Sequence, residues 1–327
     1  MKSRVVGLLL MLLFSLSLVA QERIRLVTYN VENLFDCQDD TLTNDEEFLP
    51  GALRRWTPYR YWNKLHAVAA ALVTIGGDRA PDIVGLCEVE NDSVLHDLTR
   101  RSALRTVRYD YLITTSADPR GIDVALLYKP TTYRPFAHRS LRLPTDQLPE
   151  GSHVRDVLCV SGELVTGDTL DLLVCHLPSR LNGRRSDRLR HSVVSVMRGA
   201  IDSLCMMRAV PRIVVMGDFN DTPDSEAMSP LVGSEGLVCV TDKLGGSYRY
   251  KGKWEQIDHF FISSSLIDTT EKLYLAKRGA WVSKDDIFIE PEPLYGGFRP
   301  RRTYNGMRYL GGTSDHLPVC LDLCFMW

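Results

Sequence analysis

The feature that most constrains the fold is a series of short apolar runs, rich in β-branched residues, that recur along almost the whole chain. Runs of this length and composition, bounded by polar segments, are typical of buried β-strands. They comprise Ile24–Tyr29, Ile83–Cys87, Tyr111–Thr115, Val124–Tyr128, Val154–Val160, Leu170–Cys175, Ile213–Met216, His259–Ile262 and Pro318–Leu323. The chain is therefore expected to build its core around β-sheets.

Two segments instead carry a helical period. In the first, Trp62, Leu65, Val68 and Leu72 fall on one face. In the second, the apolar face runs from Val193 to Leu204, and Ser186 and Asp187 provide start signals. A few helices among many strands indicate sheets covered by helices rather than an all-β barrel.

Neither an internal repeat nor a linker rich in Pro, Gly and Ser divides the chain, so residues 21–327 are expected to form a single compact domain. Two polar stretches, Gln38–Thr57 and Lys284–Gly312, are predicted to be long loops, which in compact domains are often functional.

Composition excludes several classes of protein. Of the 327 residues, 44% are hydrophobic and 24% are charged, which rules out a chain disordered throughout. The formal net charge of −2 does not demand a nucleic-acid partner, because polyanion binders usually carry a basic excess. A local basic cleft could still bind phosphate groups.

The first twenty residues form a separate unit. Lys2 and Arg4 precede an almost entirely apolar run, Val5–Ala20, and polar residues follow from Gln21. This pattern predicts a signal peptide over residues 1–20 and an exported protein, periplasmic or extracellular. An uncleaved N-terminal anchor is the alternative. No second run of this kind follows, so no stable membrane insertion of the mature chain is expected.

Export raises the question of disulfides for the eight cysteines. Several of them, such as Cys87 and Cys175, lie inside apolar runs, where Cys acts as a small buried hydrophobe. Free buried thiols are the preferred interpretation, and a pair on neighbouring strands is the alternative. The spacing does not resemble a zinc site.

Polar side chains gather at the ends of the predicted strands. They are Asn30, Glu32, Glu88, His176, Asp218, Asn220, Asp221, Asp258, Asp315 and His316. A single Asp or His at a strand end is usually a cap or turn residue. So many carboxylates and amides together with two histidines instead indicate a site held on a rigid sheet edge.

The residue types also suggest a cation. Carboxylate and amide oxygens suit Mg²⁺, Mn²⁺ or Ca²⁺, whereas zinc would need more His or Cys. A hard cation neutralises phosphate charge, and histidines move protons near neutral pH. Together these groups predict hydrolysis of a phosphate ester.

Several segments identify a resemblance. They are TYNVENLF at Thr28–Phe35, LCEVEN at Leu86–Asn91, GIDVALLY at Gly121–Tyr128, CHLPSR at Cys175–Arg180, GDFNDTP at Gly217–Pro223, IDHFFIS at Ile257–Ser263 and SDHLPV at Ser314–Val319. In kind and order they resemble the endonuclease/exonuclease/phosphatase superfamily, which includes pancreatic deoxyribonuclease, abasic-site endonucleases, neutral sphingomyelinases and inositol-polyphosphate phosphatases. The resemblance covers nearly all of the mature chain.

The resemblance implies a four-layer α/β sandwich, in which two mixed β-sheets pack face to face with helices outside. It also implies metal ligation by Glu88 and Asn30, with Asp315 completing the metal or His environment. Glu32 stands where the family usually has Asp, so its role is left open.

The remaining site residues receive roles by the same resemblance. Asp218 and Asn220 would position the phosphate and the water. His316, oriented by Asp258, would be the general base or proton carrier. His176 would donate a hydrogen bond to the phosphoryl oxygen as charge builds there.

Substrate contacts are expected from the basic residues near these segments. Arg180 follows His176 by four residues, and Arg120 precedes GIDVALLY. Tyr248 could stack on a base or sugar. The leading hypothesis is a secreted endonuclease, with nucleic acid as the phosphodiester substrate. The alternatives are a sphingomyelinase-like lipid phosphodiesterase, a phosphatase on a small phosphate ester, or a non-catalytic binding relative. The oligomeric state is left open.

Overall fold

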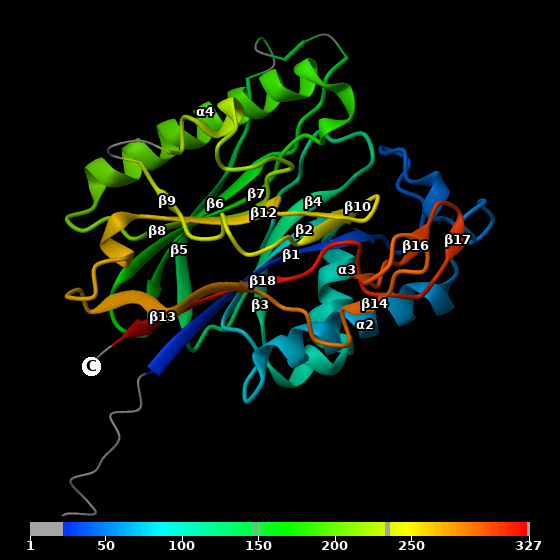
Figure 1. The fold of residues 1–327 in the computed structure, drawn as a ribbon, viewed down its shortest axis with the longest axis horizontal. Helices are drawn as coiled ribbons and strands as arrows, with labels where there is room; N and C mark the ends of the chain where they lie inside the picture. Colours follow the sequence, from blue (N-terminus) through cyan, green and yellow to red (C-terminus); the bar gives the residue numbers. More distant parts are fainter. Residues whose placement is uncertain (1–21, 145, 147, 150, 233–235, 326–327) are drawn as a thin grey trace, which may run out of the picture.

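Two mixed six-stranded sheets form the framework (Figure 1). The computed structural model describes residues 22–144, 146, 148–149, 151–232 and 236–325. The first sheet has the order β13 (Leu273–Val282), β18 (Val319–Phe325), β1 (Glu22–Leu34), β2 (Ile83–Val89), β4 (Asp123–Tyr128) and β3 (Asp110–Ile113). The second has the order β5 (Tyr133–Leu141), β6 (Val157–Leu164), β7 (Thr169–His176), β8 (Ile213–Asp218), β12 (Asp258–Ile262) and β9 (Val238–Cys239). The predicted pair of mixed sheets is confirmed.

Alternating side chains along each strand create the layers. In β1, Leu26 points into the apolar cluster between the two sheets, whereas Val27 and Tyr29 point into a cluster beneath α2 (Pro58–Gly76). In β8, Val214 joins the intersheet cluster and Val215 packs under α4 (Arg184–Met207). Each central strand is therefore buried on both faces, which explains its continuous apolar sequence.

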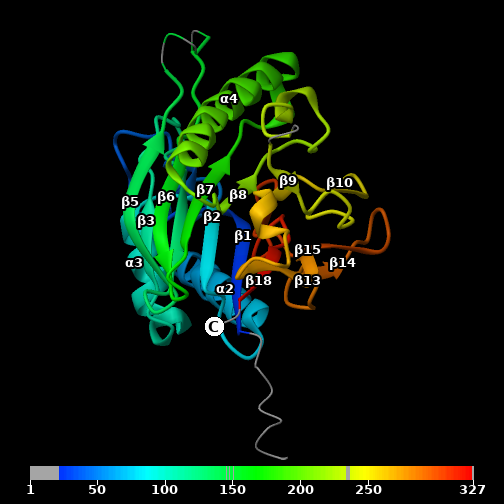
Figure 2. The ribbon, with the colours of Figure 1, turned by 90° about the vertical axis from the view of Figure 1, so that its left-hand side faces the viewer.

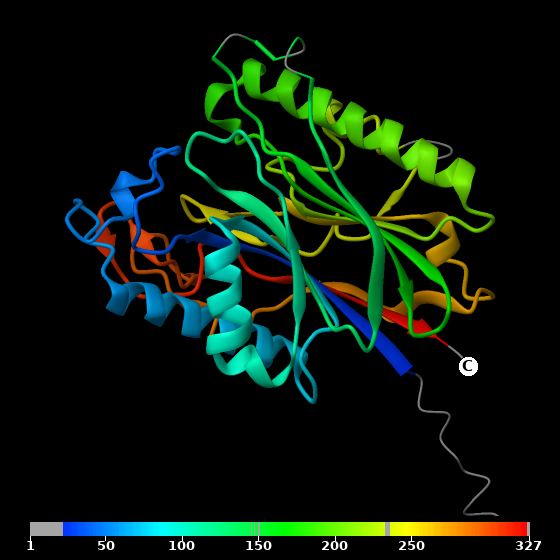
Figure 3. The ribbon, with the colours of Figure 1, turned by 180° about the vertical axis from the view of Figure 1, so that it is seen from behind.

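The helices cover the outer faces of the sandwich. Helix α4 lies along the second sheet, and α2 with α3 (Asp92–His96) lies on the opposite side of the molecule (Figure 2 and, from behind, Figure 3). Helix α2 starts after Thr57, whose hydroxyl accepts the Arg60 N–H, and has Pro58 in its first turn. The order helix, sheet, sheet, helix confirms the predicted four-layer α/β sandwich.

Both predicted long loops contain short elements. The stretch Gln38–Thr57 includes a 3₁₀ turn, Glu46–Phe48, and its Phe48 ring stacks on Phe35 with centroids 4.1 Å apart. The stretch Lys284–Gly312 forms two small hairpins, β14 (Ile289–Pro291) with β15 (Phe298–Pro300) and β16 (Tyr304–Asn305) with β17 (Arg308–Tyr309). A further hairpin pairs β10 (Tyr248–Tyr250) with β11 (Lys253–Glu255).

The predicted leader, residues 1–20, lies outside the described residues. Among the helices that are described, none combines the length and the apolar character that a membrane span requires. All eight cysteines are free thiols, and Cys87, Cys159, Cys175, Cys320 and Cys324 are buried, as the preferred interpretation expected.

Candidate active site at one edge of the sandwich

Strand direction brings the predicted site residues together. Strands β1 and β2 are parallel, as are β7 and β8, so their carboxyl ends lie at a common edge of the sandwich. Strand β12 is antiparallel to β8, with Asp258 directly opposite Asp218, while His176 is opposite Asp218 on the other side. The segment before β18, which is antiparallel to β1, brings Asp315 and His316 to the same edge.

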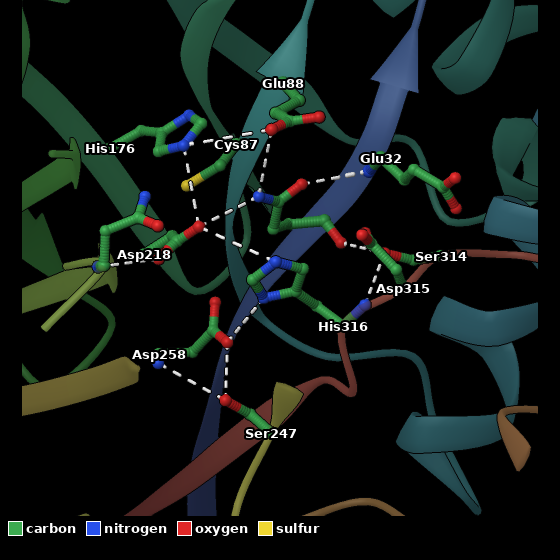
Figure 4. Close-up of polar contacts among 12 residues, drawn as sticks. Glu32, Cys87, Glu88, His176, Asp218, Ser247, Asp258, Ser314, Asp315 and His316 are labelled. Atoms are coloured by element: carbon green, nitrogen blue, oxygen red, sulfur yellow. Dashed lines mark hydrogen bonds and ion pairs between the residues drawn. The ribbon is translucent and has the colours of Figure 1, made fainter. Parts of the chain in front are cut away.

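Asp218 is the centre of this cluster (Figure 4). Its Oδ2 accepts a hydrogen bond from Asn30 Nδ2 at 3.0 Å and lies 3.5 Å from His176 Nε2 and 3.8 Å from His316 Nε2. Its Oδ1 accepts the Asn220 N–H at 2.8 Å. Residues from both sheets thus meet on one buried carboxylate.

His316 is held by a buried acidic partner. Its Nδ1 is hydrogen-bonded to Asp258 Oδ2 at 2.8 Å, and Ser247 Oγ donates to the same oxygen at 2.6 Å. This contact leaves His316 Nε2 facing Asp218. The arrangement fixes the ring orientation and stabilises the imidazolium form.

The backbone around the site adopts unusual conformations. Glu88 and Asn220 have φ angles of 66° and 51°, which non-glycine residues rarely adopt. Gly217, with φ of 147°, lies against β7 so closely that a Cβ would meet the Cys175 carbonyl oxygen at 1.9 Å. Such strain is often found where a side chain must be aimed at a reaction centre.

Burial and neighbouring charges shift the pKa values of Asp218, His316 and His176 in different directions. Burial and the Asp258 charge raise the pKa of Asp218 to about 7, although the nearby His316 opposes the shift. Burial would lower the pKa of His316, but the charges of Asp258 and Asp218 raise it well above its usual range. Burial and the Arg155 charge hold the pKa of His176 well below its usual range. Near neutral pH one histidine is therefore cationic and the other neutral.

Glu88 and Asn30 are neighbours, as the metal prediction requires. Asn30 Nδ2 donates to Glu88 Oε1 at 3.3 Å, and the Asn33 N–H donates to Glu88 Oε2 at 2.8 Å. The Asn30 amide oxygen accepts the Glu32 N–H at 3.0 Å. Separately, Asp218, Asp258 and His316 offer ligand atoms within 4.8 Å of one another. The edge thus contains acidic and His groups that could hold a cation.

Glu32 has a different environment from its neighbours in the sequence. It is 8% exposed, and its carboxylate accepts the backbone N–H groups of Thr303 at 2.6 Å and Tyr304 at 3.1 Å. Lys64 from α2 is buried nearby and donates to Thr303 Oγ1 and to the Thr313 carbonyl. These contacts anchor the segment that leads to His316, a role that sequence reasoning left open.

Asp315 lies at the same edge without contacting the central carboxylate. Its Oδ2 pairs with Arg302 at 3.2 Å, and its charge raises the pKa of Glu32, after burial as the main cause. Ser314, the residue before it, donates to the Asn30 carbonyl and accepts the His316 N–H. Through Ser314 the segment Ser314–His316 is bonded to β1 of the first sheet, and through His316 it is bonded to Asp258 of the second.

Arg155 is a site residue that sequence reasoning missed. Its guanidinium donates to the carbonyls of His176 at 3.0 Å and Leu177 at 3.1 Å, and it pairs with Asp118 at 2.8 Å. Asp118 also pairs with Arg120 at 3.4 Å, and this arginine is half exposed. The only signal in the sequence was the pair Arg155–Asp156 inside an otherwise apolar predicted strand.

A cavity of about 1090 Å³ opens over the cluster. We call it the pit; Glu88, His176, Asp218, Asn220 and His316 line it. Its wall also includes the three predicted substrate contacts, Arg120, Arg180 and Tyr248. The Tyr248 ring lies 4.9 Å from the His316 ring, and Arg180 forms an ion pair with Glu255.

We compared the chain with protein-family models, with curated proteins and with solved structures. Residues 25–324 match the model of the Endonuclease/Exonuclease/phosphatase family. No curated protein matches the chain. A solved endonuclease/exonuclease/phosphatase family protein from Bacteroides thetaiotaomicron aligns with a TM-score of 0.60 and 18% identity, over 94% of this chain and 99% of that one.

Two further solved structures have the same fold. A mannosyl-6-phosphatase from Bacteroides thetaiotaomicron aligns with a TM-score of 0.61 and 18% identity, over 92% of this chain and 100% of that one. The human nocturnin catalytic domain gives a TM-score of 0.57 and 17% identity, over 93% and 95% of the two chains. The chain therefore belongs to the endonuclease/exonuclease/phosphatase family, whose members are phosphoesterase hydrolases.

Proposed function

We propose that this protein is a divalent-metal-dependent phosphodiesterase, with nucleic acid as its leading substrate. The observation that carries the proposal is the convergence of Glu88, Asp218 and His316 from distant parts of the chain on one buried cluster. An acidic residue facing a pit, beside one cationic and one neutral histidine, matches the demands of phosphoryl transfer from an ester to water.

The donor set fits a hard cation. Glu88 faces the pit with a side chain 15% exposed, so one of its oxygens can be reached from the pit. Asn30 and the carboxylates of Asp218 and Asp258 add further oxygens nearby. None of these ligand groups is a thiol, as a hard cation requires. Glu88 and Asn30 would hold Mg²⁺ or Mn²⁺. The ion would neutralise phosphate charge and polarise the phosphorus–oxygen bond.

The residues of the pit then divide the proton chemistry. His316 Nε2 lies 3.8 Å from Asp218 Oδ2, and the nearby histidine favours the ionised carboxylate. Asp218 would take the proton of the attacking water, with Asn220 fixed beside it by a hydrogen bond to the Leu177 carbonyl. His176, which stays neutral, would donate from Nε2 to the phosphoryl oxygen.

The basic and aromatic side chains in the wall of the pit favour a phosphodiester substrate that carries several phosphate groups. It includes five arginines besides the partly sequestered Arg155, and three tyrosines. These are Arg54, Arg120, Arg180, Arg185, Arg302, Tyr248, Tyr250 and Tyr304. Arginine binds successive phosphates, and tyrosine stacks on unpaired bases. A phosphate monoester is the second candidate, because four of these arginines already pair with the carboxylates of Glu47, Asp118, Glu255 and Asp315, which leaves less positive charge for a long polyanion.

The test is hydrolysis by the purified protein lacking residues 1–20, in Mg²⁺ or Mn²⁺. Plasmid DNA, RNA, sphingomyelin, a sugar phosphate and bis-p-nitrophenyl phosphate are compared at equal protein concentration. Cleavage of DNA or RNA supports the nucleic-acid proposal, and cleavage of the sugar phosphate alone supports the monoester. Binding without product in every assay would contradict an enzymatic function.

Domain organisation and export belong to the same proposal. The apolar cluster between the two sheets, which contains residues of both, favours one catalytic domain over residues 21–327. The pattern of residues 1–20 favours cleavage near Ala20 and export. N-terminal sequencing of the protein recovered outside the cytoplasm of its cell tests the cleavage and the export.

A further inference from the structure

The hairpin formed by β10 and β11 supplies part of the wall of the pit. Tyr248, Tyr250 and Glu255 of this hairpin line the cavity. Tyr248 and Tyr250 are two residues apart in one strand, so their side chains leave it on the same face, roughly 6.5 Å apart along the strand. We call these two residues the tyrosine row. It leads from His316, whose ring lies 4.9 Å from the Tyr248 ring, to the exposed side chain of Tyr250.

The rings of the tyrosine row are accessible, unlike that of the third tyrosine in the wall. Tyr304 is 6% exposed, and its hydroxyl donates to the Arg54 carbonyl at 2.9 Å. Tyr250 is 53% exposed and Tyr248 is half-buried. An aromatic ring that is accessible in a cavity wall offers a face on which a flat group can stack.

The hairpin brings no positive charge to the wall. The structure describes all of β10 and β11, and of these residues only the tyrosine row and Glu255 line the pit. Glu255 lies directly opposite Tyr248 and forms an ion pair with Arg180. The arginines of the wall come from other segments. Phosphate groups are therefore expected towards those arginines, and the uncharged part of a nucleotide towards the tyrosine row.

Hydrogen bonds join the inner end of the tyrosine row to the segment that carries His316. The Ser247 carbonyl accepts the Leu317 N–H at 2.7 Å, and Tyr248 forms an isolated β-bridge with His316. Ser247 Oγ also donates to Asp258, which holds the His316 ring (Figure 4). The contacts that hold the histidine therefore also set the position of the tyrosines beside it.

A second hairpin, β14 with β15, supports the outer end of the row. The Arg249 guanidinium donates to the carbonyls of Phe298 and Gly296. The turn between β10 and β11 packs on the same hairpin, because a Cβ at Gly252 would lie 2.7 Å from the Tyr295 Cβ. Since these contacts hold the row before a ligand binds, stacking on it costs little conformational entropy.

We propose that the tyrosine row stacks on unpaired bases next to the scissile phosphate, which makes single-stranded nucleic acid the preferred substrate. This inference rests on the nucleic-acid function proposed above and narrows it. A duplex presents only the edges of its bases in the grooves, so the face of a base can be stacked on only after it leaves the duplex. Stacking on an aromatic ring tolerates any base. The protein should therefore select single strands without selecting a sequence.

Steady-state hydrolysis by the purified protein lacking residues 1–20 tests this preference in Mg²⁺. A labelled strand of mixed sequence is compared with the same strand annealed to its complement, once as DNA and once as RNA. The single strand should be cleaved with a kcat/KM at least roughly tenfold higher than that of the duplex. Bis-p-nitrophenyl phosphate is hydrolysed in parallel to show that the preparation is active.

Tyr250 is the informative position, because Tyr248 contacts the His316 ring and its replacement would also disturb the histidine. Tyr250→Leu removes an exposed ring and should raise KM for the single strand roughly 5- to 100-fold, with a much smaller change in kcat. Tyr250→Phe keeps the ring and should restore the wild-type KM. Tyr59→Leu is the matched control, because Tyr59 is an exposed tyrosine at the start of α2, outside the lining of the pit.

Removal of single bases shows whether the ring contacts a base. The slow variant Glu88→Gln is titrated with a short labelled strand and with versions that lack one base at each position in turn, and fluorescence anisotropy reports binding. One of these abasic strands should bind at least roughly fivefold more weakly than the intact strand. The loss should be much smaller in the double variant with Tyr250→Leu, because that base then has no ring to stack on.

The outcomes separate this inference from the proposed function. Equal kcat/KM for single strand and duplex, or a wild-type KM in Tyr250→Leu, would overturn the inference while nucleic-acid hydrolysis stands. So would a Tyr250→Phe variant as impaired as Tyr250→Leu, or an equal loss from base removal with and without the Tyr250 ring. Hydrolysis of bis-p-nitrophenyl phosphate without cleavage of any nucleic acid would instead remove the nucleic-acid function, and this inference with it.

Discussion

Replacing Asp258 by asparagine tests how the His316 ring obtains its charge. The two side chains are almost the same size, so the asparagine amide oxygen can still accept from Nδ1 of His316, which now lies 2.8 Å from Asp258 Oδ2. Ser247, which donates to that oxygen, can keep a partner. The substitution therefore removes the negative charge and places the new NH2 group where the buried, unpartnered Asp258 Oδ1 now lies.

The expected size of the effect follows from the contact. Hydrogen bonds to charged groups contribute about 1.5–3 kcal/mol, which corresponds to roughly one to two pKa units. The pKa of His316 should fall by this amount, because the charge of Asp258 is a main cause of its upward shift. If the imidazolium form or its orientation is required in the transition state, kcat should fall roughly 10- to 100-fold with little change in KM.

The free energy of unfolding depends on pH because the pKa of His316 differs between the folded and unfolded states, and the direction of that difference sets the sign. The pKa of His316 is raised on folding, so its stabilising contribution is fully present below the unfolded-state pKa of about 6.5. It disappears as the pH rises through the higher folded-state pKa. The loss of unfolding free energy in Asp258→Asn should therefore be largest in mildly acidic buffer and should shrink in alkaline buffer.

Two measurements check this prediction. The pH profile of kcat on bis-p-nitrophenyl phosphate should show the His316 limb at lower pH than in wild type. Urea unfolding at pH 6 and pH 9 should give the unequal losses just described. An unchanged pH profile together with equal losses at both pH values would refute the assigned partnership of Asp258 and His316.

Three further changes have defined outcomes. His176→Ala should fold normally and lose roughly 100-fold or more in kcat, read from steady-state hydrolysis; wild-type turnover would remove it from the chemistry. Arg155→Met should lower the free energy of unfolding by about 3–5 kcal/mol in urea titration, because Asp118 would keep only the half-exposed Arg120 as a partner and the buried carbonyls of His176 and Leu177 would lose their donor. An unchanged urea midpoint would refute this dependence. Gly217→Ala should fail to fold or lose more than about 3 kcal/mol, since its Cβ would overlap the Cys175 carbonyl, and an intact Tm would argue against that close approach.

The central strands could be predicted from the sequence because both of their faces are buried. Strands β1, β2, β7 and β8 each contain a mostly apolar run, and strand direction places the polar residues near their carboxyl ends, such as Asn30, Glu88, His176 and Asp218, at the common edge. The family and the four-layer sandwich were likewise confirmed. Short motifs sufficed here because each comes from a rigid strand end.

Two of the edge strands, β5 and β13, could not be predicted by the same reasoning. Strand β5 contains Arg134, Pro135 and Arg139, and most of its side chains are exposed. Strand β13 contains Lys277, Arg278 and Gly279. Each lies at the edge of its sheet, where one side has no neighbouring strand and polar residues are tolerated. Their sequences therefore lack the apolar signal of a central strand.

The residues that hold the site's loops in place, Arg155 and Lys64, could not be predicted from the sequence either. Arg155 acts through the carbonyls of His176 and Leu177, and Lys64 acts through Thr303 and Thr313, which are more than two hundred residues away. Contacts with backbone atoms leave no pairing pattern in one sequence. Only coordinates could reveal them.

The most direct test of the proposed function is hydrolysis of one phosphodiester substrate by wild type and by Glu88→Gln, during removal and return of Mg²⁺. We predict that chelation abolishes wild-type turnover, that Mg²⁺ restores it, and that folded Glu88→Gln stays at least roughly 100-fold slower at the same Mg²⁺ concentration. Full turnover in excess chelator, or equal rates for the two proteins, would contradict the metal-assisted mechanism at the pit.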